Sequence, residues 1–255
     1  MKRKNYISDK VGLSQSDTDV LFDNLLKNQF LGINYDGYEL YLFEEHMLWK
    51  PDFHHDNKVK IAREASKVLR NGQNIYIDAG STTHEFVKVL CEKITARNVS
   101  QLNIVAAAVE QANMISQCCL NMGFDDFSGI KLYIAGGSIR HSTQTISPLL
   151  PSKERFTGII SEIGRFDIAI LGINGVNSKG ELTTQDTIEI YGKYEAIASS
   201  KRILFICDDS KFGITEEILI SNLSNNVELI TNRNDDNVAL MDIYEEFSEK
   251  ITFAR

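Results

Sequence analysis

The sequence predicts an α/β fold, a three-layer α/β/α domain with a mainly parallel sheet and a small N-terminal piece before it. Two observations lead to this prediction. From residue 58 onward, short apolar runs typical of buried strands alternate with amphipathic helical segments. Polar or glycine-rich segments follow four of these runs directly, and ligands of open α/β sheets bind at such strand ends.

The expected strands are short, largely apolar runs, as for strands that are buried on both faces. They lie at Asn74–Ile77, Leu102–Ala108, Lys131–Ala135, Phe166–Leu171, Ile203–Cys207 and Glu228–Thr231. Helices are expected at Lys58–Leu69, from Thr83 to about Glu92, from Ala108 to about Leu120, at Thr187–Ser199 and at Met241–Lys250. The first of these helices ends at Asn71-Gly72, a common stop signal.

The domain limits are predicted at 1–50, 51–57 and 58–255. The first segment has short helical signals, with Ser14 as a helix cap, followed by two β-prone runs around Leu31–Ile33 and at Glu39–Phe43. A turn signal at Tyr35–Tyr38 separates the two runs and predicts a hairpin. Helices followed by a hairpin are typical of a winged helix. The second segment is rich in Pro, His and Asp, which indicates a linker.

The composition excludes several classes of protein. The chain has 255 residues, is 43% hydrophobic and carries a net charge of −8. An acidic chain has no overall attraction for nucleic acid, so DNA binding would need a local basic patch. No apolar stretch approaches the roughly 18 residues that span a bilayer, and no apolar run follows the basic N-terminus. We therefore expect a cytoplasmic protein with no membrane partner.

The cysteines and histidines match no known metal-site spacing. The four cysteines include no CxxC pair, and His54 and His55 lie in a polar stretch that we interpret as part of the linker. We therefore expect no metal site and no cofactor.

The segment Asp78–Thr83 is the most informative candidate site. It follows an expected strand and begins an expected helix, so Gly80 allows a tight turn and close approach of a ligand. The free N–H groups of a helix N-terminus, beside the hydroxyls of Ser81, Thr82 and Thr83, suit a phosphate. A plain helix cap is an equally good interpretation of this segment taken alone.

Three further strand ends carry candidate groups. Gly136 and Gly137 precede Arg140, which could pair with an anion. Asn174 lies in the segment Gly172–Gly175, and Lys211 could hold a phosphate as a point charge. Each segment alone is more typical of an ordinary turn or a solvated loop. Together they favour one shared pocket.

The ordered motifs IYIDAGSTT, KLYIAGGSIR, FDIAILGINGV, IEIYGKYEAIASSKR and FICDDSKFG resemble the effector-binding domain of the DeoR family of bacterial transcriptional regulators. The resemblance covers roughly residues 58–232. It implies the fold of ribose-5-phosphate isomerase, glucosamine-6-phosphate deaminase and the CoA transferases, and a phosphorylated sugar or related metabolite as ligand. The pocket that it implies contains Gly80, Ser81, Thr82, Thr83, Gly136, Gly137, Arg140 and Lys211. With Asp78 and Asn174, these are the expected effector-binding residues.

The sequence departs from the family pattern at the Ala106–Ala108 strand end, at Ser147-Pro148, where the family usually has Gly-Pro, and in the N-terminal piece. Ala106–Ala108 stands where the family usually has a Thr-Asn-Ser-like strand end, which removes potential hydrogen-bond donors to a ligand. The N-terminal piece resembles a degenerate winged helix, because Asp17–Phe22 lacks both arginines of the family's recognition helix. Between Val11 and Trp49 a single lysine stands against seven acidic residues, a net charge of −6 that would repel DNA.

The resemblance implies a homo-oligomeric transcriptional regulator, a repressor of sugar metabolism, with no enzymatic activity. Two alternatives stay open. The chain could be a ligand-binding or partner-binding protein that has lost DNA reading. It could also be an isomerase-like or deaminase-like enzyme, for which Asp78, Asp208, Asp209 and Glu189 are the candidate proton-transfer groups.

Overall fold

The computed structural model describes residues 31–34, 37–40, 54–122, 129–141, 143–147, 156–187, 190–224 and 226–255. The chain forms two units, Met1–His46 and Met47–Arg255. In the first unit, β1 (Leu31–Asn34) and β2 (Gly37–Leu40) pair antiparallel, with Asn34 opposite Gly37. The predicted hairpin is confirmed, although its second strand begins before Glu39. The expected N-terminal helices, and Glu189, lie outside the described residues.

The second unit is built on a seven-stranded parallel sheet. In spatial order its strands are β14 (Ile251–Ala254), β13 (Val227–Asn232), β11 (Ser200–Ile206), β8 (Phe166–Leu171), β3 (Asn74–Ile77), β4 (Asn103–Ala106) and β5 (Lys131–Ile134). The chain runs outward from β3 through β4 to β5, then returns to β8 beside β3 and runs outward the other way. The order therefore reverses between β3 and β8, and such a switch point is where open α/β sheets bind ligands.

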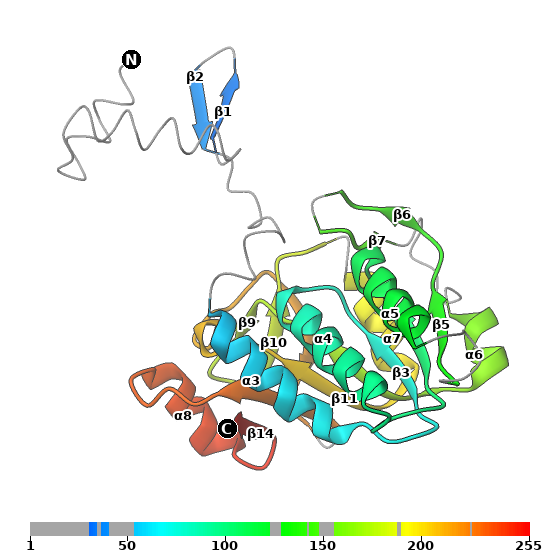
Figure 1. The fold of residues 1–255 in the computed structure, drawn as a ribbon. Coiled ribbons are helices and arrows are strands. Elements are labelled where there is room, and N and C mark those ends of the chain that lie inside the picture. The colour runs from blue at the N-terminus through cyan, green and yellow to red at the C-terminus, as the bar shows by residue number, and fades with distance from the viewer. Residues whose placement is uncertain are drawn as a thin grey trace. The chain divides into compact units, whose positions relative to one another are not determined.

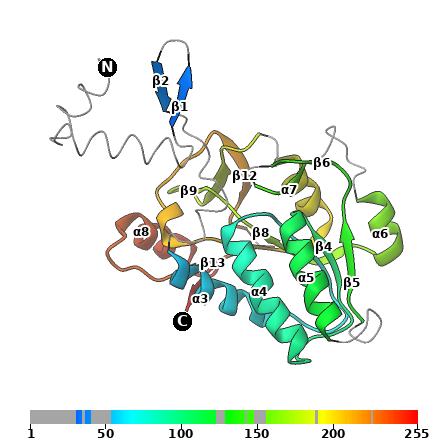
Figure 2. The ribbon, with the colours of Figure 1, turned by 45° about the horizontal axis from the view of Figure 1, so that its top comes forward.

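Helices cover both faces of the sheet. On one face α3 (His55–Ala65), α4 (Ser81–Thr95) and α5 (Val109–Asn121) lie side by side (Figure 1). On the other face are α6 (Thr157–Ile163), α7 (Ile190–Ala198) and α8 (Val238–Phe247). In both views α6 lies beside the edge strand β5 (Figure 2), and the Tyr133 hydroxyl donates to Glu162 across this contact at 2.8 Å. None of the helices among these ranges is long and apolar enough to cross a bilayer.

Two hydrophobic cores fill the space between these layers, because successive strand residues point to opposite faces. Ile168 and Ile170 of β8 belong to the core under α3–α5, whereas Ala169 and Leu171 belong to the core on the other face. Each fully buried Leu or Ile contributes about 1.5–3 kcal/mol. The predicted three-layer α/β/α fold with a mainly parallel sheet is confirmed.

Several short strands were not predicted. A small antiparallel sheet joins β12 (Ile218–Asn222), β10 (Glu181–Thr184) and β9 (Gly175–Val176). A two-stranded ribbon pairs β6 (Ser138–Ile139) with β7 (Ile146–Ser147). Strands this short are marginal by themselves, and tertiary pairing decides whether they form.

Candidate functional site

The loop Asp78–Thr83 leads from the centre of the sheet into α4. Gly80 has φ +144° and ψ 162°, a backbone region that is essentially restricted to glycine. This conformation lets the chain turn directly from the strand end into the helix. The turn is fixed by the Gly80 carbonyl, which accepts from the His84 amide at 2.8 Å and from the Thr83 hydroxyl at 2.9 Å.

The start of α4 offers unused donors. Within the part of the chain that the structure describes, the amides of Ser81, Thr82 and Thr83 donate to no acceptor. Such amides, together with the positive end of the helix dipole, attract a phosphate or another anion. The geometry is therefore that of a possible anion site as well as of a helix start.

Asp78 joins two strand ends at the switch point. One of its carboxylate oxygens, Oδ2, accepts from the Gly172 amide at 3.0 Å and from the Lys193 ammonium. The same ammonium donates to the Gly172 carbonyl at 3.2 Å. Asp78 is 2% exposed and Lys193 is 4% exposed, so this ion pair lies inside the protein. Asp78 thus ties β3, β8 and α7 together.

Lys193 was missed at the sequence level, although a signal was present. It lies three residues after Ile190 and three before Ala196, both of which are buried in the same core. A lysine on the apolar face of a helix has to find a carboxylate inside the fold, because an unpaired buried charge is very costly.

Gln111 was also missed and supports the same loop from α5. Its side chain is fully buried, and its Nε2 donates to the Asp78 carbonyl at 3.0 Å and to the Thr83 hydroxyl at 3.2 Å. The loop that would hold a ligand is therefore anchored from both faces of the sheet.

His84 adds no positive charge beside this loop. Burial lowers its pKa, and the nearby Glu110, whose Oε2 lies 3.9 Å from Nδ1, opposes this shift only in part. The imidazole is therefore neutral near pH 7, so the attraction for an anion comes from backbone amides.

The glycines after β5 differ in their surroundings. A Cβ on Gly137 would lie 2.1 Å from the Ser147 carbonyl oxygen, so glycine is required for the pairing of β6 with β7. A Cβ on Gly136 would meet nothing within 4 Å. Gly136 therefore leaves open space, whereas Gly137 serves close backbone packing.

Arg140 and Asn174 belong to one network around Asp186, a buried carboxylate that was not predicted. Arg140 pairs with Asp186 through Nη1 and Oδ2. The side-chain oxygen Oδ1 of Asn174 accepts from the Thr184 hydroxyl at 2.8 Å, and the Thr184 hydroxyl oxygen accepts from the Asp186 amide at 3.2 Å. The structure thus links the second and third predicted segments, but Arg140 already has an internal carboxylate partner.

Lys211 differs from these cations. It lies in the short 3-10 helix η2 (Asp209–Lys211) after β11, and its ammonium makes no ion pair or hydrogen bond with any described residue. Since only β8 separates β11 from β3, their ends lie about 10 Å apart. The strand ends that precede Lys211 and the start of α4 are therefore separated by a single strand.

The backbone around β7 covers the carboxyl end of β4. Ala106, Ala107 and Ala108 are all buried, and the Ala107 carbonyl accepts from the Ile146 amide at 2.8 Å. Pairing with the segment around β7 therefore occupies the place where the family resemblance implies polar side chains.

A groove of about 580 Å³ lies elsewhere, along the edge strand β14. It is lined by Lys67, Arg233, Tyr244 and Phe253 among others, and none of the predicted site residues borders it. Its position gives no support to a ligand at the switch point.

Comparison with known proteins places the second unit in a family. A family model described as the DeoR C-terminal sensor domain matches residues 53–233. The chain belongs to the DeoR family. The match includes every predicted site residue, from Asp78 to Lys211.

Relatives of this DeoR-family chain bear the names of regulators. It is 28% identical over 172 residues to an uncharacterized HTH-type transcriptional regulator, FruR, of Bacillus subtilis, which covers 67% of this chain and 59% of the relative. It is 30% identical over 169 residues to the glycerol-3-phosphate regulon repressor of Escherichia coli, covering 66% and 59%. The chain thus matches about 59% of the length of these relatives.

Among solved structures, ribose-5-phosphate isomerase A from Methanocaldococcus jannaschii matches with a TM-score of 0.42 and 19% identity, over 62% of this chain and 54% of that one. A score this low supports no conclusion about function.

Proposed function

We propose that this DeoR-family chain is a cytoplasmic, homo-oligomeric transcriptional repressor of sugar metabolism, and that its second unit senses a phosphorylated sugar or related metabolite. The names of its relatives support regulation, since they are a transcriptional regulator and a regulon repressor. The effector would bind at the carboxyl edge of the sheet, between the loop Asp78–Thr83 and Lys211.

One observation supports this assignment above the others. The uncommitted donors at the start of α4 and the uncommitted ammonium of Lys211 flank the switch point of the sheet. A phosphate on α4 would leave the rest of a sugar phosphate pointing toward β8 and β11. Arg140 and Lys193 neutralise Asp186 and Asp78 instead, so they would shape the pocket rather than contact the anion.

Regulation would then follow from linkage. A ligand shifts a conformational equilibrium only by its difference in affinity for the two states. Bound effector would join the ends of β3 and β11 and would favour the arrangement in which those ends fit it. The proposal assigns no catalytic step to Asp78, whose carboxylate oxygen already holds Gly172 and Lys193.

A thermal-shift screen tests the effector site. Glycerol 3-phosphate, pentose phosphates and hexose phosphates are compared with the same compounds without phosphate. A true effector at a hundredfold excess over its Kd stabilises the fold by about 2.7 kcal/mol. Lys211→Gln should abolish most of that shift, and Lys179→Gln, an exposed lysine in another loop, should leave it unchanged. A shift that is equal for sugars with and without phosphate would contradict the proposal.

The second candidate function is that of a protein that binds a ligand but no longer binds DNA sequence-specifically. The net charge of −6 between Val11 and Trp49 favours it, since DNA affinity depends on neutralising phosphates with Lys and Arg. A gel shift with the upstream region of the protein's own gene, at low and at high salt, separates the two. A specific complex that weakens with salt supports the repressor. Its absence at low salt favours the second candidate.

A further inference from the structure

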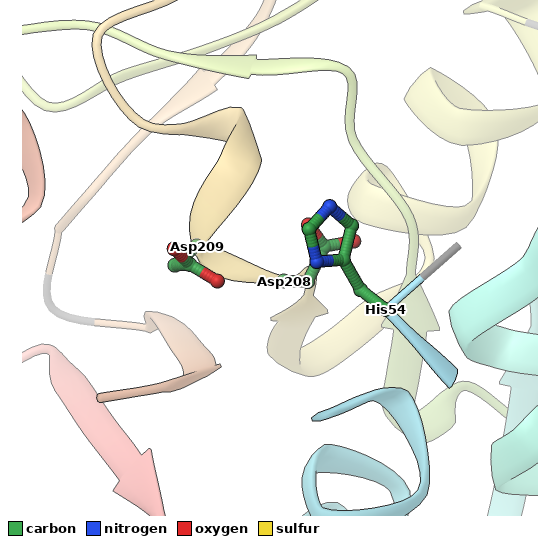
Figure 3. Close-up of side chains that lie close together, drawn as sticks. All are labelled: His54, Asp208 and Asp209. Atoms are coloured by element: carbon green, nitrogen blue, oxygen red, sulfur yellow. The ribbon is translucent and has the colours of Figure 1, made fainter. Parts of the chain in front are cut away.

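Three side chains that bind metals in other proteins meet on the second unit. His54 immediately precedes α3, Asp208 follows β11, and Asp209 begins η2. Figure 3 shows the His54 ring in front of Asp208, with Asp209 next along the chain. One potential ligand atom from each residue lies within 4.8 Å of the other two. One imidazole with two carboxylates is a ligand set that suits first-row divalent cations.

The two carboxylates are buried, which distinguishes them from ordinary surface acids. Asp208 is 3% exposed and Asp209 is 7% exposed. Asn232, Asn234 and Asn237 surround Asp209 with side-chain amide donors. Two acidic side chains therefore lie at a place from which water is largely excluded.

Asp209 is held in a fixed orientation. Its Oδ1 accepts from the Asn232 side-chain amide at 2.7 Å, and its Oδ2 accepts from the Asn234 amide at 2.6 Å. Each carboxylate oxygen can accept a second partner. Carboxylates that bind metals are usually oriented by such outer hydrogen bonds.

Asp208 has an oxygen with no protein partner. Its Oδ1 accepts from the Ser210 amide at 3.1 Å, whereas Oδ2 accepts a hydrogen bond from no residue within the ranges that the structure covers. No lysine or arginine in those ranges forms an ion pair with either carboxylate. A bound cation would supply the partner that this oxygen lacks among the described residues.

The dimensions fit an ion after a small adjustment. Zinc lies about 2.0–2.2 Å from imidazole nitrogen and carboxylate oxygen, so ligand atoms around it are at most about 4.4 Å apart. The present span of up to 4.8 Å exceeds this by a few tenths of an ångström. His54 is exposed, so its ring can rotate toward the fixed carboxylates.

We propose that His54, Asp208 and Asp209 bind one divalent transition-metal ion, preferentially Zn²⁺, which joins the start of α3 to the end of β11. This site goes beyond the proposed effector function, because it uses neither Lys211 nor the start of α4. Three protein ligands leave at least one coordination position for water or another oxygen. Zn²⁺ should bind more tightly than Mn²⁺, following the general affinity order for such ligands.

Isothermal titration calorimetry of the full chain, stripped with EDTA, tests the proposal. We expect one Zn²⁺ per chain, and weaker binding of Mn²⁺. His54→Ala should lower the affinity for Zn²⁺ at least about tenfold, because it removes a direct ligand. His54 is exposed, so the substitution leaves the hydrophobic cores unchanged, and circular dichroism checks the fold of the variant.

His55→Ala is the matched control. His55 is the adjacent exposed histidine, and its Nδ1 lies 3.8 Å from Glu85 rather than near Asp208. Zn²⁺ affinity should be unchanged in this variant. Asp208→Asn keeps the size of the side chain and should weaken binding as His54→Ala does. Wild-type affinity in His54→Ala, an equal loss in His55→Ala, or no stoichiometric binding would each overturn the proposal.

Discussion

Two groups of buried carboxylates lie at the same edge of the same sheet, and they are neutralised differently. At the β3 end, Asp78 meets the Lys193 ammonium and the Gly172 amide. At the β11 end, Asp208 and Asp209 meet only uncharged donors and the exposed His54 among the residues that the structure places. We call these the closed site and the open site.

This contrast separates charged groups that stabilise the fold from charged groups that remain available to a ligand. In the closed site the cation is part of the chain, so the ion pair holds strands and a helix together. In the open site the carboxylates are positioned by amides, which orient a charge without cancelling it. Lys211, next to the open site, is likewise left without a carboxylate partner in the described structure. Ligand chemistry is therefore expected at the β11 side of the switch point.

Removing the internal cation should have the largest effect. Lys193→Met leaves Asp78 buried without its partner, and breaking a buried pair in this way costs about 3–5 kcal/mol. Urea unfolding measures the loss. Lys201→Met is the control, because the pair of Lys201 with Asp167 at 2.7 Å is largely exposed and should contribute at most about 1 kcal/mol. Equal losses in both variants would contradict the structural role assigned to the buried ion pair of the closed site.

The loop beside the closed site should be the next most sensitive. Gly80→Ala forces a side chain into a backbone region that costs about 1–3 kcal/mol, and it should also weaken any phosphate response. Gly136→Ala is the matched change, since its Cβ meets nothing within 4 Å and its φ is not positive. Thermal unfolding with and without effector compares the two. A Gly136→Ala variant as unstable as Gly80→Ala would contradict this account of the loop.

The smallest expected effect is on pH dependence. Burial lowers the pKa of His84 below 6.5, so the unfolded chain takes up a proton more readily than the folded one. Above the pKa of His84 in the unfolded chain, about 6.5, this residue does not lower the free energy of unfolding. As the pH falls from about 6.5 toward the lower pKa of the folded state, it lowers the free energy of unfolding. His84→Gln should flatten the fall in unfolding free energy between pH 7 and 5. His55→Gln, at an exposed position, should not. A slope unchanged by His84→Gln would show that other groups cause it.

The layers, most strands and the positions of the loops could be predicted from the sequence alone. Largely apolar runs such as Phe166–Leu171 favour buried strands of a parallel sheet, so their bounds could be predicted from the sequence pattern. The ordered motifs also indicated the family, which the comparisons confirmed. Features that depend on residue type and on neighbours along the chain, such as strands, turns and family motifs, can be predicted from the sequence.

Which charged groups pair with one another follows from the three-dimensional fold. Lys193 and Asp78 are 115 residues apart, and nothing local pairs them. Arg140 resembled an anion ligand in sequence but pairs with Asp186, which the small sheet brings near, and His54 resembled a linker residue but lies beside Asp208 and Asp209. Electrostatic partners are set by distance in space. The order of strands across the sheet fixes that distance, and the spacing of residues along the chain does not.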